Sequence, residues 1–435
     1  MTQHADQDAI PSGKFSRALT GGRTAAKVGG KMIGYYAKRP FLSGPARRNA
    51  REKVSRESAR TLFQGLSLLK GTALKMAQML SLEMDILPEE ICRELAKSYH
   101  RVPPINRSLV RKAVKDGLGR PPEAIFSQFV ADAFAAASLG QVHRALNGDG
   151  RELAVKIQYP GIGKTIRNDI SLLGNLFALI IQEDLLRPTL AEIAARLREE
   201  VDYLHEAENL TFFHKHLIME GVRIPRALAD LTSATVLTST MMPGKPLDQW
   251  LEGHPGQEAR DHIARKLNDL MLKGLYELHV IHADPNPGNF IIAEDLTIGL
   301  VDFGCVKRLD PEFVEQYRQL ALAAAHDDKT LHFDLMIQLG LIPPDLDDPT
   351  RREVEEMSAA AGSWFSRLFA DDFFDFKENP GFIGQGQKVM RRFHHLHRHL
   401  RVNPDFIFLD RTRYGLLRIF EKMGARVGFR NTYEW

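Results

Sequence analysis

Two short polar stretches in the second half of the sequence carry side chains that could hold a metal ion on phosphate groups. The first, VIHADPNPGNFII (residues 280–292), places His282, Asp284 and Asn289 in the pattern H-x-D-x-x-x-x-N. The second, thirteen residues after Asn289, is the triplet D-F-G that begins at Asp302. These patterns are typical of phosphoryl-transfer sites, where the asparagine and the D-F-G aspartate hold Mg²⁺ and the other aspartate orients the attacking oxygen. We therefore expect Asn289 and Asp302 to bind Mg²⁺ and Asp284 to act on the nucleophile.

Two upstream segments supply the phosphate-binding parts that such a site needs. Residues 135–142, AAASLGQV, align with the phosphate loop G-x-G-x-x-G-x-V, with Ala135 and Ala137 in place of two glycines. Lys156 ends the strand-like segment LAVK and would bind phosphate oxygens. Taken alone, the first segment also fits a bend of small residues in a strand, and the second segment also fits an ordinary strand that ends in lysine. The phosphate loop, the lysine, the H-x-D-x-x-x-x-N pattern and the D-F-G triplet, found in this order, together predict a protein-kinase-like nucleotide site.

The alanine residues change what the phosphate loop can do. Small side chains let backbone N–H groups come close to phosphate oxygens, and alanine still permits this approach. Alanine disfavours the positive φ angles that glycine accepts. We therefore expect a stiffer and altered grip on the phosphates.

The sequence after D-F-G bears on the substrate. It runs CVKRLDPEFVEQYRQLALAAAH and takes on helical spacing within about six residues. It contains no A-P-E triplet and leaves no room for the long activation segment that normally supports a peptide substrate. Phosphorylation of a protein is therefore less expected than hydrolysis or transfer to a small molecule.

Hydrophobic periodicity predicts the elements that position these groups. Residues 57–85 and 86–99 have helical spacing, residues 125–159 are typical of strands joined by turns, and most of the chain after residue 246 is helical. The sequence thus predicts an α+β, protein-kinase-like bilobal fold, in which a mixed strand and helix lobe precedes a helical lobe. The predicted domains are a basic arm (1–56), a helical extension (57–105), an N-lobe with a helical insertion (106–243) and a C-lobe (244–435).

Composition excludes some classes of protein. The chain of 435 residues is 44% hydrophobic and 26% charged with a net charge of +3, which is ordinary for a globular protein. Its two cysteines, Cys92 and Cys305, lack metal-site spacing and favour a reducing compartment. The first ten residues lack the apolar core of a secretory signal, and the longest apolar runs are too short to cross a bilayer. We expect a cytoplasmic, bacterial-type protein without a transmembrane helix, placed either in solution or peripherally on the inner face of the membrane.

The first part of the chain is strongly basic. Between Lys14 and Arg56 twelve lysine and arginine side chains stand against one acid, Glu52. The segment lacks the interleaved aromatic residues and fold signatures of nucleic-acid binding, so we expect no nucleic-acid partner. With Ile33 and Tyr35 among the basic residues, it fits an anionic membrane surface. A solvated, disordered tail is the alternative of equal weight.

Over roughly residues 60–430, the sequence resembles the UbiB/AarF family of atypical protein-kinase-like proteins, whose members support ubiquinone biosynthesis. The family's alanine-rich loop is matched by Ala135, Ala136, Ala137 and Ser138. Its nucleotide-binding lysine is matched by Lys156, and its E-x-D motif by Glu200 and Asp202. Glu206 resembles the glutamate that pairs with that lysine, and the catalytic and metal motifs match at residues 282–289 and 302–304.

The hallmark K-x-G-Q motif of this family has a near match in the helical extension. Here it is Lys75-Met76-Ala77-Gln78, with alanine in place of the glycine. In the family this helix folds over the site where a protein substrate would dock, which implies a gating role for Lys75 and Gln78. Because Ala77 adds a methyl group where the family has glycine, it bears on how tightly this helix would pack. An ordinary amphipathic core helix is the alternative for this segment.

The resemblance implies an activity that uses ATP, with ADP as product and Mg²⁺ as cofactor, in a lipid pathway. The implied partners are a lipid or quinone precursor, an anionic membrane surface and a protein complex of ubiquinone biosynthesis. ATP hydrolysis is the first expectation. A small-molecule or lipid kinase on the same scaffold, and a non-catalytic binding module gated by nucleotide, are the alternatives.

Overall fold

The computed structural model describes residues 105–137, 139–162, 197–395 and 403–435 without a break, and scattered positions within 24–61 and 166–194. The chain divides into two compact units. The N-terminal unit comprises residues 1–205 and 228–239, and the C-terminal unit comprises residues 206–227 and 240–435. The ranges that the sequence predicts for the arm, the extension and the two lobes stay a prediction.

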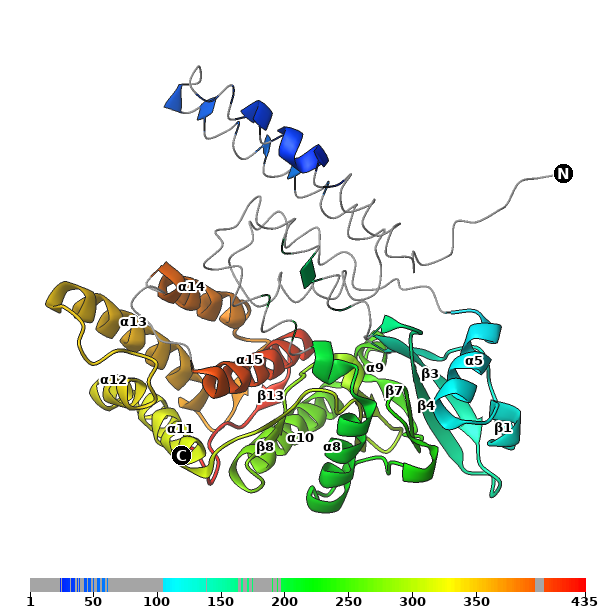
Figure 1. Cartoon of the computed structure of the whole chain (residues 1–435). Helices are drawn as coiled ribbons and strands as arrows, with labels where there is room; N and C mark the ends of the chain where they lie inside the picture. The colour runs from blue at the N-terminus through cyan, green and yellow to red at the C-terminus, as the bar shows by residue number, and fades with distance from the viewer. Residues whose placement is uncertain are drawn as a thin grey trace. The chain divides into compact units, whose positions relative to one another are not determined.

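The N-terminal unit is centred on a hairpin of strands that carries Lys156, with helix α5 beside it (Figure 1). Its elements are α5 (Arg107–Leu118), β1 (Gln128–Phe129), β2 (Ala135–Ala137), β3 (Gly140–Leu146), β4 (Glu152–Gln158) and β6 (Val236–Thr240). The strands lie in the order β1-β3-β4-β6, and β2 also pairs with β3. Strands β3 and β4 are antiparallel, with Gly140 opposite Gln158 and Leu146 opposite Glu152.

The core of this unit follows from two periodicities. Alternate residues of β4, namely Leu153, Val155 and Ile157, are buried, as expected for a strand with one face against a core. Helix α5 buries Val110 and Val114, which lie one turn apart and pack in the same cluster. The strands that the sequence predicts around the lysine are therefore present.

The C-terminal unit is mainly helical, with short strands that frame its loops. Its helices are α8 (Tyr203–His216, whose first three residues belong to the N-terminal unit), α9 (Leu247–Glu252), α10 (Gln257–Tyr276), α11 (Pro311–Ala325), α12 (Lys329–Gln338), α13 (Asp348–Ser366), α14 (Phe382–His395) and α15 (Pro404–Met423). Its strands are β5 (Val222–Arg223), β7 (Lys245–Pro246), β8 (Val280–His282), β9 (Phe290–Ile292), β10 (Ile298–Leu300), β11 (Val306–Arg308), β12 (Phe374–Asp375) and β13 (Arg426–Val427). They form a four-stranded sheet in the order β5-β10-β9-β7 and the pairs β8–β11 and β12–β13.

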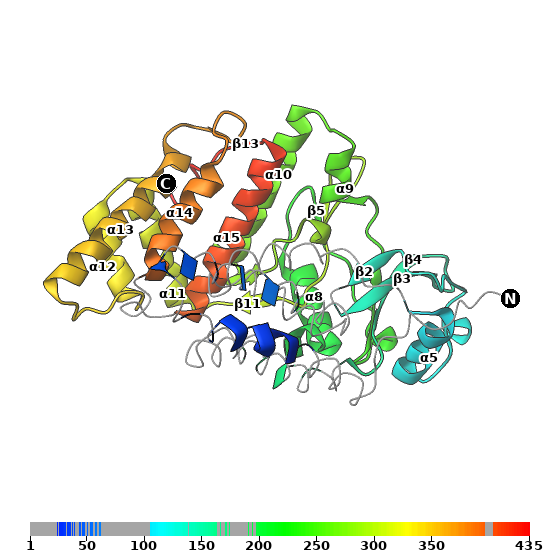
Figure 2. The same cartoon turned by 90° about the horizontal axis from the view of Figure 1, so that it is seen from above.

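Helices α10 and α15 run side by side in this unit (Figure 2). Helix α11 begins at Pro311, seven residues after Gly304, so the short connection expected after D-F-G is confirmed. The predicted α+β class is confirmed as well, since strands and helices are both present in the order expected. Among the described residues, no helix has the length and apolar character that crossing a membrane requires.

A buried histidine in the C-terminal unit gives a prediction about stability and pH. His332 of α12 is 8% exposed, and its Nδ1 lies 2.9 Å from the Oγ of Ser358 in α13. Burial lowers the pKa of His332 from 6.5 to about 4. The unfolded chain therefore binds more protons between these two values, and the free energy of unfolding falls as the pH falls through that window. At 1.36 kcal/mol per pKa unit, the full loss is about 3 kcal/mol.

The measurement is urea unfolding at pH 7.5 and pH 4.5 for the wild type and His332→Gln. We expect the variant to lose about 2–3 kcal/mol less than the wild type on acidification, because its side chain does not titrate. His216→Gln, at an exposed position on α8, is the control and should follow the wild type. The prediction would be contradicted if the free energy of unfolding fell by the same amount in the wild type and in His332→Gln between pH 7.5 and pH 4.5.

Candidate functional site

The predicted catalytic loop, residues 283–289, is a tight turn that hydrogen bonds within the loop hold in place. It leaves β8 after His282 and includes a single 3₁₀ turn at Pro287–Asn289. The backbone N–H of Asn286 donates to the carbonyl oxygen of Asp284 at 2.8 Å, and that of Asn289 donates to Asn286 at 2.9 Å. The side-chain oxygen of Asn286 accepts from the N–H of Gly288 at 3.0 Å. The polar residues of this stretch thus fix the path of the loop as well as its chemistry.

Asp284 and Asn289 are in direct contact. The amide nitrogen Nδ2 of Asn289 donates to Oδ2 of Asp284 at 2.9 Å and to its carbonyl oxygen at 3.2 Å. Asn289 is 8% exposed, so its orientation is restricted. Because the nitrogen is used by Asp284, the amide oxygen of Asn289 is the atom left to bind a cation.

Asp302 is held in an uncommon backbone conformation beside this loop. Its φ angle is +62°, in the left-handed region that few residues other than glycine adopt. Its carbonyl oxygen lies 2.7 Å from Nε2 of His282, and the N–H of Val301 donates to the carbonyl oxygen of Asn289 at 2.9 Å. His282 and Asn289 therefore connect the catalytic loop to the D-F-G triplet. Backbone strain of this kind concentrates at functional sites.

The rest of the D-F-G triplet is anchored by helix α8. Phe303 is 1% exposed, and its ring meets that of His282 edge-on at 5.4 Å. Nδ2 of Asn209, itself 2% exposed, donates to the carbonyl oxygen of Phe303 at 3.2 Å. Sequence reasoning missed Asn209. Its spacing of three residues from Glu206, on the same face of one helix, was the available signal.

Glu206 lies against the D-F-G glycine. It is 3% exposed, and a Cβ placed on Gly304 would lie 3.7 Å from its Oε2 and 3.3 Å from Oδ1 of Asp302. The structure therefore brings Glu206 into the neighbourhood of Asp302. Its pairing with Lys156, which belongs to the N-terminal unit, stays a prediction.

The phosphate loop of the N-terminal unit is a strand hairpin. Ala135, Ala136 and Ala137 form β2 and pair with β3, where Ala136 lies opposite Gln141 and Ala137 opposite Gly140. None of the three has a positive φ angle, so alanine fits the backbone found here. Lys156 lies on the neighbouring strand, opposite Val142, with its Nζ 5.2 Å from the centre of the Tyr203 ring. Ser138, Lys75 and Gln78 lie outside the described residues.

The E-x-D motif is tied to the same strand as the lysine. Nε2 of Gln158, two residues beyond Lys156, donates to the carbonyl oxygen of Val201 at 2.8 Å. Oδ1 of Asp202 accepts from the N–H of His205 at 3.1 Å, which is the contact of a residue that caps the start of a helix. Asp202 thus caps the start of α8, which begins at Tyr203. Gln158 is a second residue that sequence reasoning missed, because its partner lies 43 residues away.

The one glycine kept in the phosphate loop has a steric role. A Cβ on Gly140 would lie 2.3 Å from the carbonyl oxygen of Ile157 and 2.7 Å from the hydroxyl of Tyr203. We expect Gly140→Ala to lower the free energy of unfolding by about 1–3 kcal/mol, because the backbone of β3 must move away from β4. Urea unfolding measures the loss. Gly148→Ala in the turn of the same hairpin, where a Cβ meets nothing within 4 Å, is the control, and equal losses would contradict the steric reason.

The side chains present fit a magnesium ion bound together with phosphates. Mg²⁺ is usually held by one or two protein oxygen ligands, with water and phosphates completing its coordination. Asp302 and the amide oxygen of Asn289 supply ligands of that type and number. Among the described residues, no cluster of three or more His, Cys, Asp or Glu could hold a metal ion. A site built from these two residues accords with a cation that arrives with a nucleotide.

Comparison with known proteins decides the family. The profile of the ABC1 atypical kinase-like domain matches residues 97–334, which is more than half of the chain. The chain belongs to this family. The ABC1 match includes the phosphate loop, Lys156, the catalytic loop and the D-F-G triplet. It confirms the resemblance to atypical kinase-like proteins of the UbiB/AarF type.

Curated relatives of this ABC1-family chain are named as kinases. It is 29% identical over 356 residues to the probable serine/threonine-protein kinase abkA of Dictyostelium discoideum, covering 77% of this chain and 63% of that protein. It is 31% identical over 333 residues to the mitochondrial atypical kinase COQ8B of Rattus norvegicus, covering 74% and 62%. It is 27% identical over 379 residues to the mitochondrial atypical kinase COQ8 of Saccharomyces cerevisiae, covering 85% and 74%. The match thus spans less than two thirds of the first two relatives.

A solved structure shares the fold of this ABC1-family chain. The structure of Rv3197 with erythromycin, from Mycobacterium tuberculosis, superposes with a TM-score of 0.59 at 23% sequence identity. The superposition covers 88% of this chain and 96% of that one. At this identity the likeness shows the fold alone.

Proposed function

We propose that this chain binds Mg–ATP and hydrolyses it, in support of ubiquinone biosynthesis. The observation that carries the proposal is the arrangement around Asp302. Its carbonyl is fixed by His282, its φ angle is +62°, and the neighbouring Asn289 is oriented by Asp284. An aspartate held in this conformation beside an amide that a second aspartate orients is the arrangement expected of a metal site in a phosphoryl-transfer protein.

Each group then has a role at a stated atom. The carboxylate of Asp302 and Oδ1 of Asn289 bind Mg²⁺, which would neutralise charge on the phosphates. The ammonium of Lys156 binds phosphate oxygens, and the backbone N–H groups of residues 135–138 approach them. The carboxylate of Asp284 accepts a hydrogen bond from the attacking water and orients it.

Water is favoured as acceptor by the short segment after D-F-G. Strand β11 begins two residues after Gly304 and pairs with β8, and α11 begins at Pro311. The chain therefore lacks, at this point, the long loop on which a peptide substrate would lie. A lipid or other small-molecule hydroxyl is the second candidate, since Asp284 is only half-buried.

The link to ubiquinone and to a membrane surface rests on relatives and on charge. The relatives from rat and yeast are named as mitochondrial atypical kinases of the COQ8 type. We propose that the basic arm holds the protein peripherally on an anionic membrane face, near a quinone precursor and the protein complex that processes it. Hydrolysis would then be coupled to handling of that lipid.

The test combines binding with turnover. Calorimetry with ATP and Mg²⁺ measures binding, and phosphate release is followed without liposomes, with neutral liposomes and with anionic liposomes. We expect Mg²⁺-dependent binding and a rate that rises only with anionic liposomes. Incorporation of labelled phosphate into a lipid or quinone precursor would favour the lipid kinase, and binding without turnover would favour the nucleotide-gated module. Absence of nucleotide binding would refute all three.

A further inference from the structure

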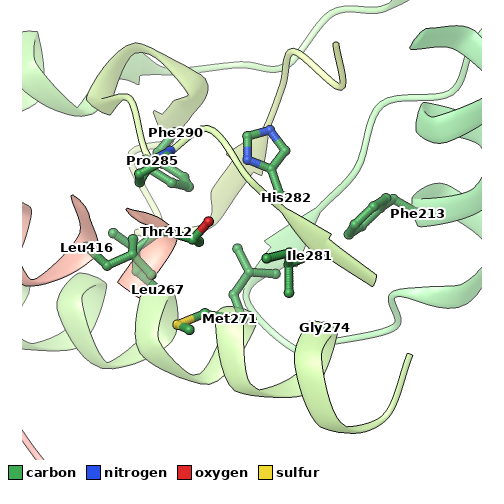
Figure 3. Close-up of a pocket in the computed structure, with 11 residues that line it drawn as sticks. Phe213, Leu267, Met271, Gly274, Ile281, His282, Pro285, Phe290, Thr412 and Leu416 are labelled. Carbon is green, nitrogen blue, oxygen red and sulfur yellow. The ribbon is translucent and has the colours of Figure 1, made fainter. Parts of the chain in front are cut away.

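The catalytic loop contacts helix α15 at a glycine. A Cβ placed on Gly415 would lie 2.2 Å from Cγ and 2.9 Å from Cβ of Pro285, the residue that follows Asp284. Distances below 3.0 Å do not occur for real side chains, so either α15 or the loop would have to move. Figure 3 shows Pro285 facing α15 beside Thr412 and Leu416. The catalytic loop thus packs, through Pro285, directly against the backbone of α15 at Gly415.

Local propensity does not explain a glycine at this point of α15. The helix runs from Pro404 to Met423, and Gly415 lies in its interior. Glycine there costs about 1 kcal/mol relative to alanine. Contact with Pro285 supplies the reason for this cost.

The two sides of the contact differ in their freedom to move. Helix α15 is fixed by Arg413, whose guanidinium binds the buried carboxylate of Glu434. Asn403 caps the start of α15, because its side-chain oxygen accepts hydrogen bonds from the backbone N–H groups of Asp405 and Phe406. The helix therefore resists displacement at both places.

The loop side has space into which it can shift. A cavity of about 30 Å³ lies beneath the catalytic loop (Figure 3). Its lining includes Leu267 and Met271 of α10, His282 and Pro285 of the loop region, and Thr412 and Leu416 of α15. Most of the lining residues are apolar, and Thr412 donates its hydroxyl to the carbonyl oxygen of Phe408. When a side chain is added at residue 415, we therefore expect the loop that carries Pro285 to move rather than α15.

We propose that Gly415 is a positioning residue for the catalytic loop. Because Gly415 has no side chain, Pro285 can pack against α15. This contact sets the position of Asp284, the residue before Pro285. The hydrogen bonds between Asp284, Asn286 and Asn289 carry the same placement to the metal-binding amide. The effect on turnover rests on the proposed function, whereas the effect on the loop does not.

The experiment compares Gly415→Ala with Gly384→Ala and with the double variant Gly415→Ala/Pro285→Ala. Gly384 lies in helix α14, and a Cβ there meets nothing within 4 Å, which makes it a matched control. Amide hydrogen exchange over residues 280–292 in nucleotide-free protein reports the loop directly. Phosphate release at saturating and limiting Mg–ATP separates kcat from KM.

We expect Gly415→Ala to speed exchange in the loop about tenfold and to lower kcat by about 10- to 100-fold, since small misplacements of reacting groups have effects of this size. Gly384→Ala should behave as the wild type. The double variant removes Cγ of Pro285, the atom at 2.2 Å, and leaves the milder contact with Cβ at 2.9 Å, so it should recover a large part of the loss in both measurements. If Gly415→Ala fails to fold and the double variant folds, that result also shows that the clash with Pro285 is the cause of the defect.

Three results would overturn the proposal. Gly415→Ala could match Gly384→Ala in loop exchange, the double variant could recover nothing, or both Gly415 variants could fail to fold, which would assign the glycine to the stability of α15. If the wild type lacks turnover, the proposed function fails, and the exchange comparison still decides the role of Gly415.

Discussion

Asp302→Asn is expected to lower Mg²⁺-dependent ATP turnover by about 10³-fold or more. The variant keeps the size and left-handed backbone preference of aspartate but loses the charge that binds the cation. A bound metal contributes several kcal/mol to the stabilisation of phosphoryl transfer, and about 4 kcal/mol corresponds to 10³-fold in rate. The hydrogen bond from His282 goes to the backbone carbonyl of residue 302, so it survives the substitution. Phosphate release at several Mg²⁺ concentrations measures the effect.

Asp327→Asn is the matched control for this substitution. Asp327 also has a positive φ angle, +52°, and its carboxylate accepts from the hydroxyl of Ser363 at 2.9 Å. It belongs to neither motif. Turnover close to that of the wild type is expected. Undiminished turnover in Asp302→Asn would remove the metal-binding role of this residue, and an equal loss in both variants would show a general effect of the substitution.

Arg413→Met is expected to lower the free energy of unfolding by about 3–5 kcal/mol, because it leaves the carboxylate of Glu434 buried without its charge partner. Arg413 is 9% exposed and Glu434 is 1% exposed. Nη1 of Arg413 lies 2.9 Å from Oε2 of Glu434, and Nη2 binds the other carboxylate oxygen. Tyr276 donates to that oxygen at 2.5 Å, and burial raises the pKa of its hydroxyl, which keeps the proton in place.

The control for this pair is Arg318→Met. Arg318 binds Glu315 one turn away on α11, and both side chains are exposed by a third or more, so the expected loss is below about 1 kcal/mol. Urea unfolding of both variants gives the comparison. The double variant Arg413→Met/Glu434→Met should recover much of the loss, since replacing a buried pair by apolar groups is often neutral. Similar losses for Arg413→Met and Arg318→Met would contradict the prediction.

Patterns of neighbouring residues predicted much of the C-terminal part of the site. The spacing of Asp284 and Asn289 fixed their order in one short loop, and the structure has them in contact. The helical spacing after D-F-G predicted the early start of α11. The small-residue run that begins at Ala135 was compatible with either a phosphate loop or a bend in a strand, and it is a strand paired with β3. Local rules suffice where both partners lie within a few residues.

The missed residues act over long separations. Asn209 binds the carbonyl of Phe303 94 residues later, Gln158 binds Val201 43 residues later, and Gly415 meets Pro285 across 130 positions. Hydrophobic periodicity shows that one face of a helix is buried, but it does not say against what. The φ angle of Asp302 could not be predicted either. Aspartate can adopt both negative and positive φ angles, so the surroundings of the residue decide which one occurs.

The pair formed by Arg413 and Glu434 sets an order of events during protein synthesis. A ribosome adds about 5–20 residues each second, and the earlier segments emerge first. Tyr276 and Arg413 therefore leave the ribosome before Glu434 does, and the ion pair that helps to hold α15 can form only once Glu434 has emerged. A chain stalled after Met423 would carry every motif of the site and still lack the contact that closes the C-terminal unit. The ion pair that fixes α15 is thus expected to form only after every motif of the site has been synthesised.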